Sequence, residues 1–321
     1  MKRLLTLLLL VSASGGGCGT QRWLLGTESD YLFIAADAIT LPNQEVQLRA
    51  RLQGGDALRP MAGQVVRFYR NDQLFKAAET DDDGVAIVSF TPDQAGDYRF
   101  RADVAPAGMP DEPPEPQELL VACRNIDSPM VVVDLDKTIV ASGFGAVLIG
   151  DPDPMAGSVD VLERLARTYT ILYLTHRPDY FSIKSKKWLK RHGYPPGPVL
   201  LSTLTGFFKG SGSYKTDALW DLRVKFEGLT IGIGDKISDA AAYHDNGLKA
   251  FLIVRIPDTD VHEPYEDLAN DLRDLDNAVQ VVTSWDQIAK ALFDGTEFPR
   301  DRTERQLRET AQRLRTDKAN R

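Results

Sequence analysis

The stretch Val131-Val132-Val133-Asp134-Leu135-Asp136-Lys137-Thr138 decides the fold of the larger part of this chain. Its run of β-branched residues indicates a buried strand, which is expected to end near Asp134, where two carboxylates follow. Open α/β folds bind ligands at the carboxyl ends of their strands, so both acids are expected at a binding edge. Carboxylates this close repel each other, and a bound Mg²⁺ would relieve the repulsion. One could then act as a nucleophile while the other transfers a proton.

Length, charge and cysteine content limit the class of protein. A chain of 321 residues suggests about two domains, and 43% apolar residues are enough for packed cores. The formal net charge of −8 gives no support for nucleic-acid binding or for a broadly basic membrane-binding surface. The two cysteines, Cys18 and Cys123, do not have the spacing of a zinc site, and Cys123 is expected to be buried in a strand.

The first 18 residues are typical of an export signal. Lys2 and Arg3 precede an apolar run over residues 4–11 that is too short to span a bilayer. Small residues then lead to Cys18, an arrangement that resembles a bacterial lipoprotein signal. This resemblance implies a lipid anchor on Cys18 and a place in the bacterial cell envelope, on the periplasmic or outer face. Gly15 departs from that pattern, so a plain secretory signal stays open as an alternative.

Residues 31–126 show the pattern of an all-β domain, which a short tether over residues 19–30 precedes. Apolar and polar residues alternate over 46–52, as a half-buried strand requires. Further strand-like runs follow at 65–69, 85–90, 95–102 and 117–123. Strands at this spacing, without a helical period, predict a sandwich. The Gly96-Asp97-Tyr98 turn resembles the tyrosine corner of immunoglobulin-like domains, so we expect an immunoglobulin-like sandwich.

Residues 129–296 show a different pattern, in which strand-like and helical runs alternate. The strand-like runs lie at 130–134, 170–174, 229–234, 249–254 and 279–283. The candidate helices lie at 158–168, 180–192, 213–226 and 238–246. Alternating β and α segments predict a doubly wound parallel sheet in an α/β domain. The remaining residues, 297–321, are highly charged over 302–321 and are expected to form a solvated helix or a frayed tail.

Chemically active side chains lie at the ends of the predicted strands, and one lies at the start of the third predicted helix, in order along the chain. They are Asp134 with Asp136, Thr175, Lys215, and Asp235 with Asp239. An anionic nucleophile that attacks a phosphate needs its charge neutralised, which Mg²⁺ and a lysine can supply. A helix cap or a turn could explain each piece alone. All the pieces in this order favour a phosphoryl-transfer site.

This ordered set resembles the haloacid dehalogenase superfamily of phosphatases, which use an aspartate nucleophile. The segments 173–178, 187–189 and 195–202, with Gly234-Asp235-x-x-x-Asp239-x-x-x-Tyr243, are similar to the catalytic domain of lipin-type and actin-patch-type phosphatidate phosphatases. The resemblance covers residues 129–255 and implies an uncapped haloacid dehalogenase-like fold with Mg²⁺ as the cofactor. Lys137 departs from the lipin family, which usually has Gly there. Some relatives have lost the first aspartates and only bind lipid, whereas both remain here.

The resemblance implies a role for each of these residues. Asp134 would be the nucleophile and Asp136 the acid/base. Thr175 and Lys215 would bind the substrate phosphate. The magnesium ligands would be Asp134, Asp235, Asp239 and the backbone carbonyl of Asp136.

The short segments on either side of Thr175 leave no room for a cap domain. An uncapped site would admit a large or membrane-embedded substrate. The helix expected over 180–192 carries cationic residues, which could contact anionic lipid or form a solvated face. They are Lys184, Lys186, Lys187, Lys190 and Arg191.

Three functions fit these observations. The first is an Mg²⁺-dependent phosphatase that forms an aspartyl-phosphate and acts on phosphatidate or a related lipid phosphate. The second keeps this chemistry in an exported acid phosphatase for soluble phosphomonoesters. The third is a non-catalytic protein that binds lipid or another surface ligand, against which the intact Asp134 and Asp136 count.

Overall fold

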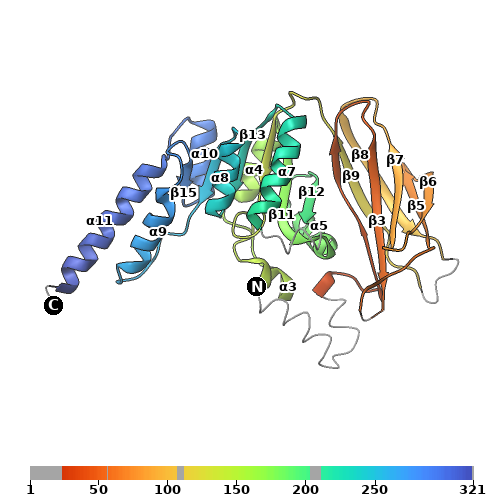
Figure 1. The fold of residues 1–321 in the computed structure, drawn as a ribbon, viewed down its shortest axis with the longest axis horizontal. Helices are drawn as coiled ribbons and strands as arrows, with labels where there is room; N and C mark the ends of the chain where they lie inside the picture. The colour runs from red at the N-terminus through yellow and green to blue at the C-terminus, as the bar shows by residue number, and fades with distance from the viewer. Residues whose placement is uncertain (1–23, 56, 107–111, 203–210, 320–321) are drawn as a thin grey trace.

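The computed structural model describes residues 24–55, 57–106, 112–202 and 211–319. An all-β region and an α/β region lie side by side in it (Figure 1). Cys18 and the predicted signal lie outside the described residues. Within the described part of the chain, the helices are too short or too polar to cross a membrane.

The all-β region consists of two sheets. The first contains β1 (Tyr31–Ala35), β3 (Val46–Gly54), β4 (Arg59–Pro60) and β7 (Val85–Phe90). The second contains β2 (Ala38–Thr40), β9 (Gln117–Cys123), β8 (Gly96–Val104), β5 (Val65–Arg70) and β6 (Gln73–Glu79), in that order. Alternate residues of both sheets, such as Leu48, Phe68 and Phe100, form one buried core. The Tyr98 hydroxyl donates to the Gln94 carbonyl at 2.9 Å, the type of bond found in a tyrosine corner.

The α/β region is built on a parallel sheet, as its sequence predicts, and this sheet has six strands. The strands are β10 (Met130–Val133), β11 (Thr170–Pro178), β12 (Val199–Ser202), β13 (Leu229–Gly234), β14 (Lys249–Ile253) and β15 (Gln280–Val282). Their order is β12-β11-β10-β13-β14-β15, so the first and fourth strands in the sequence are neighbours. At this switch point the connections leave in opposite directions, and open α/β sheets bind their ligands outside the carboxyl ends of the strands at such a point.

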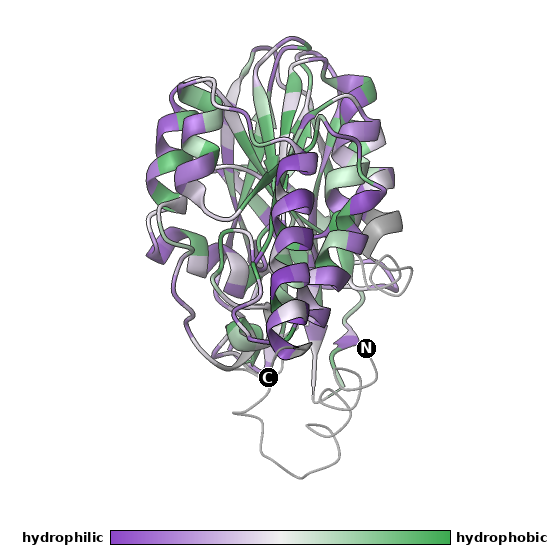
Figure 2. Ribbon diagram, turned by 90° about the vertical axis from the view of Figure 1, so that its left-hand side faces the viewer, coloured by the Kyte–Doolittle hydropathy of each residue, from purple (hydrophilic) through white to green (hydrophobic). Residues whose placement is uncertain are grey.

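Helices cover both faces of the parallel sheet, because its strand residues are buried on both sides. One face packs on α7 (Ser211–Lys225), α8 (Ile237–Asp245), α9 (Glu263–Arg273) and α11 (Arg300–Ala319). The other packs on α3 (Phe144–Ile149), α4 (Ser158–Ala166), α5 (Ser182–Arg191) and α10 (Trp285–Phe293). Hydrophobic residues gather in the strands, and hydrophilic residues lie on the outer faces of the helices (Figure 2).

The structure differs from the sequence predictions in several places. β11 continues to Pro178, so Thr175 lies within the strand rather than directly after it. The helix expected from residue 180 begins as a 3₁₀ turn, η1 (Asp179–Phe181), before α5. Of the two expectations for residues 302–321, the helix is confirmed and the frayed tail is wrong, because α11 buries Leu307 and Ala311 in the core that it shares with α9. The apolar residues of α11 lie at helical spacing and form its buried face. They are sparse, since about four of every five residues are polar, so the sequence alone does not show this face clearly.

Candidate active site

Strand order brings the first and last acidic motifs together. Asp134 follows β10 directly, and Asp235 follows β13, its parallel neighbour. The Asp134 N–H donates to the Ile233 carbonyl at 3.0 Å, which extends the strand pairing up to the carboxylate. Both acids therefore lie at the switch point, although a hundred residues separate them in the sequence.

Lys215 joins this cluster from helix α7. Its Nζ lies 2.9 Å from Asp134 Oδ2 and 2.6 Å from Asp239 Oδ2, and its side chain is 1% exposed. Burial lowers the pKa of the Lys215 ammonium, but Asp134, Tyr243 and Asp239 raise this pKa by more. The net pKa lies above its usual value, so Lys215 is a fixed positive charge between two carboxylates.

Three carboxylates at this point fit a divalent cation. One oxygen from each of Asp134, Asp235 and Asp239 lies within 4.8 Å of the others. Asp235 Oδ1 and Asp239 Oδ1 are buried and have no hydrogen-bond partner among the described residues. Burial, together with the charges of Asp134 and Asp239, raises the pKa of Asp235 to about 6. A hard cation with oxygen ligands, such as Mg²⁺, would satisfy these oxygens and relieve the repulsion.

Asp136 lies apart from the three-carboxylate cluster, in an ion pair that the sequence did not reveal. Its two carboxylate oxygens accept from Arg177 Nη2 at 2.7 Å and Nε at 3.0 Å. Thr175 is buried on the neighbouring strand, where its Oγ1 accepts the Arg177 N–H at 3.3 Å. The position of Arg177 two residues after Thr175 was the available signal, since both face the same side of an extended strand.

The backbone conformation at Lys137 shows why the lipin pattern usually has glycine at this position. Its φ is +58°, in the left-handed region that glycine enters without a steric penalty. The lysine side chain is exposed, and its stem passes Gly143 at the start of α3. A glycine is therefore the residue that this turn favours, and lysine holds the same turn at a local cost.

Two lysines of α5, the cationic helix that could contact lipid, form hydrogen bonds within the molecule. The Lys186 ammonium lies 2.6 Å from Asp37 of the all-β region and donates to the Ala35 carbonyl at 3.0 Å. Lys187 donates to the Gly26 carbonyl at 3.2 Å. The all-β region therefore engages Lys186, and contact between this helix and lipid stays a prediction.

The described residues around the carboxylate cluster leave it without a covering domain. Between Asp136 and Thr175 they form α3, α4 and connecting loops. Between Thr175 and residue 202 they form η1, α5 and β12, and residues 203–210 lie outside the description. These are elements of the sheet and its helical layers, which is consistent with an open site.

Comparisons with solved structures yield weak likenesses. A CARDB domain from Pyrococcus furiosus is 20% identical over 30% of this chain and 96% of that one, with a TM-score of 0.21. The fibronectin(III)-like modules of Clostridium thermocellum CbhA are 15% identical over 30% of this chain and 91% of that one, with a TM-score of 0.20. The titin M3 domain is 10% identical over 30% of this chain and 97% of that one, with a TM-score of 0.22. At such TM-scores these likenesses carry no argument about fold or activity.

Sequence comparison is informative for the α/β region. No curated protein matches the chain. The matched family model is described as "PITM 1-3, LNS2 domain", and it covers residues 131–256, which include the acidic motifs, Thr175 and Lys215. Residues 131–256 of this chain are therefore similar to an LNS2 domain, which is a phosphatase-like domain of the lipin type.

Proposed function

We propose that this protein is an Mg²⁺-dependent phosphatase that forms an aspartyl-phosphate and acts on phosphatidate or a related lipid phosphate. The observation that carries the proposal is the buried cluster of Asp134, Lys215, Asp235 and Asp239 at the switch point. Its location inside the LNS2-like segment supports a lipid phosphate as the substrate.

Each side chain has a task in this reaction. The Asp134 carboxylate attacks phosphorus, and the bond from phosphorus to the leaving oxygen breaks as Asp136 gives that oxygen a proton. A water molecule then attacks the aspartyl-phosphate while Asp136 takes its proton, which releases phosphate and restores Asp134. Asp134, Asp235 and Asp239 would hold Mg²⁺, which supplies positive charge next to the phosphate. Lys215 and the Thr175 hydroxyl would bind phosphate oxygens.

Phosphate release from phosphatidate tests this proposal. The full chain in detergent micelles should release phosphate with Mg²⁺ and lose that activity with a chelator. Asp134→Asn keeps the shape of the side chain but removes the anionic nucleophile, so activity should fall to background. Activity that survives this substitution would contradict the aspartyl-phosphate mechanism.

An exported phosphatase for soluble phosphomonoesters is the second candidate. The engagement of Lys186 by Asp37 favours it, because this lysine cannot meet a lipid headgroup while the two regions stay packed. A panel that compares phosphatidate with nucleotides and sugar phosphates separates the two. A higher kcat/KM for the soluble esters, with the same dependence on Asp134, would assign the second function.

We propose that Cys18 carries a lipid anchor that keeps the protein in the bacterial cell envelope. Leu25, in the tether that follows Cys18, packs in one hydrophobic cluster with Phe181 of η1 and Ile183 of α5. Phe181 and Ile183 follow β11, the strand on which Thr175 lies. A lipid on Cys18 would therefore hold this side of the α/β region near a membrane. Cys18→Ser should move the protein from the detergent phase to the aqueous phase in a two-phase partition of cells that express it. Retention in the detergent phase would argue against lipidation of Cys18.

A further inference from the structure

Arg177 is a buried cation that the mechanism above does not use. Its side chain is 1% exposed, whereas that of its partner Asp136 is 22% exposed. The two-pronged contact, at 2.7 and 3.0 Å, sets both the position and the plane of the Asp136 carboxylate. A paired guanidinium and carboxylate combine charge with a fixed geometry, which a single contact does not provide.

The protein around Arg177 holds its guanidinium in place. The remaining guanidinium nitrogen, Nη1, donates to Ser185 Oγ at 3.0 Å, and Ser185 is buried in α5. The Arg177 carbonyl accepts from Ser202 Oγ of β12 at 3.2 Å. Its N–H donates to Thr175 Oγ1. Arg177 is thus connected to a helix, an edge strand and the residue proposed to bind phosphate.

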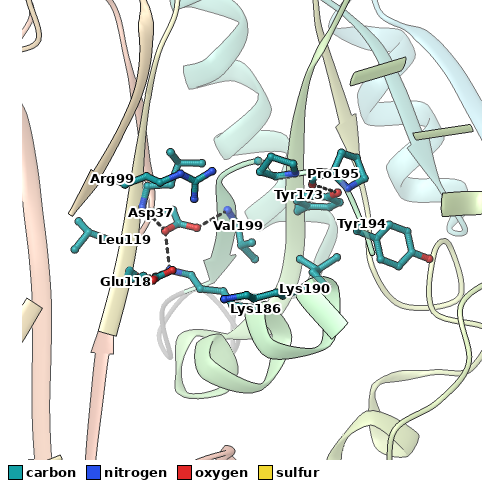
Figure 3. A pocket seen from close by; sticks show the side chains of 14 residues that line it. Asp37, Arg99, Glu118, Leu119, Tyr173, Lys186, Lys190, Tyr194, Pro195 and Val199 are labelled. Atoms are coloured by element: carbon teal, nitrogen blue, oxygen red, sulfur yellow. Dashed lines mark hydrogen bonds and ion pairs between the residues drawn. The ribbon is translucent and has the colours of Figure 1, made fainter. Parts of the chain in front are cut away.

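The all-β region in turn holds the elements that carry these contacts. Asp37 accepts from Lys186 of α5 at 2.6 Å and from the Val199 N–H of β12 at 2.9 Å (Figure 3). Beside this contact the two regions line an open pocket of about 350 Å³ (Figure 3). Arg51 of β3 pairs with Asp179 of η1 at 2.8 Å, directly after Pro178. The all-β region therefore contacts the segment 177–202 near both of its ends, at Asp179 and at Val199.

We propose that Arg177 is the positioning residue of the acid/base Asp136, and that α5 holds it in place through Ser185. This inference rests on the proposed function. The side-chain hydrogen bonds of Arg177 run to Asp136 and Ser185. Through Asp136, Arg177 would act on the steps in which that carboxyl group gives or takes a proton. In the first step that proton goes to the leaving oxygen, so a leaving group that departs without a proton should not need Arg177.

Leaving-group dependence tests the proposal. The full chain in detergent is assayed with p-nitrophenyl phosphate, whose phenolate leaves unaided, and with a short-chain phosphatidate, whose alkoxide needs a proton. Arg177→Lys keeps the positive charge but removes the two-pronged contact of the guanidinium with Asp136. We expect kcat/KM for phosphatidate to fall about 10- to 100-fold, with a much smaller fall for p-nitrophenyl phosphate. Arg223→Lys is the matched control, because Arg223 donates to three backbone carbonyls at the far end of α7, and it should change neither value.

A second variant and a double mutant make the test decisive. Ser185→Ala removes one support of Arg177 and leaves the charge in place, so it should show the same substrate pattern with a smaller loss. In an Asp136→Asn background, Arg177→Lys should cause no further loss, because its partner no longer transfers a proton. Thermal unfolding of each variant shows whether the fold is retained, and Ser185→Ala decides the question where Arg177→Lys unfolds.

The outcomes separate this inference from the proposed function. Equal losses on the two substrates, or a further loss in the Asp136→Asn background, would overturn the positioning role while an inactive Asp134→Asn leaves the phosphatase mechanism intact. A wild-type protein that hydrolyses neither substrate would overturn both.

Discussion

Lys215→Met tests the electrostatic design of the carboxylate cluster. Methionine has a similar length and is apolar, so it suits the buried position. It removes the ammonium group, which lies 2.9 Å from Asp134 and 2.6 Å from Asp239. Three carboxylates whose oxygens approach within 4.8 Å would then face each other without this ammonium. Removing one partner of a buried ion pair costs about 3–5 kcal/mol.

The magnitude can be measured as a change in unfolding temperature. For a domain of this size, each kcal/mol corresponds to about 2–4 °C, so the apo variant should melt about 6–20 °C lower than wild type. Mg²⁺ should restore more stability to the variant than to wild type, because the cation meets a less compensated negative site. At a concentration of 100 times Kd, binding contributes about 2.7 kcal/mol.

Lys225→Met on the same helix is the matched control, because Lys225 is exposed. It should change the free energy of unfolding by less than about 0.5 kcal/mol. Differential scanning calorimetry of the three proteins, with Mg²⁺ and with a chelator, gives the comparison. A loss below about 1 kcal/mol in Lys215→Met would refute the claim that this ammonium compensates the cluster. An equal gain from Mg²⁺ in variant and wild type would refute the shared electrostatic site.

Three further predictions concern the cation, the sheet and the contact between the two regions. Because burial raises the pKa of Asp235 to about 6, the ionised apo form is disfavoured, and this group contributes less stability as pH rises through that value. Mg²⁺ must bind the ionised form, so its effect on Tm should grow between about pH 5 and about pH 7, and a flat profile would exclude Asp235 as a ligand. Gly232→Ala would place Cβ 2.3 Å from the buried Tyr243 ring, so urea titration should show a loss of about 1–3 kcal/mol, whereas Gly145→Ala meets nothing within 4 Å and should be near neutral. Asp37→Ala removes three hydrogen bonds between and within the regions and should cost about 2–4 kcal/mol in the same titration, and a loss below about 1 kcal/mol would mean that the contact does not hold them together.

Local sequence patterns were sufficient for the class of each region. The run Val131–Val133 is buried on both faces, so it reads as a continuous apolar strand of a parallel sheet. The helical period over 213–226 places Ala218, Leu219, Leu222 and Phe226 on one face. The last three are buried, and Ala218 is partly buried against the same core. The strand β12 was missed, because Val199–Ser202 is too short to show a period that separates it from a loop.

The sequence by itself determined which residues stand at the carboxyl ends of strands, because burial and secondary structure leave a local period in the chain. It therefore brought forward Asp134 and Asp235 as candidates, and it added Lys215, which lies in helix α7. Only the tertiary structure decided which side chains meet. The pair of Asp136 with Arg177 joins residues 41 apart, and the pair of Lys186 with Asp37 joins residues 149 apart. Such contacts depend on strand order and on the packing of one region against the other, and neither leaves a periodic trace in the sequence.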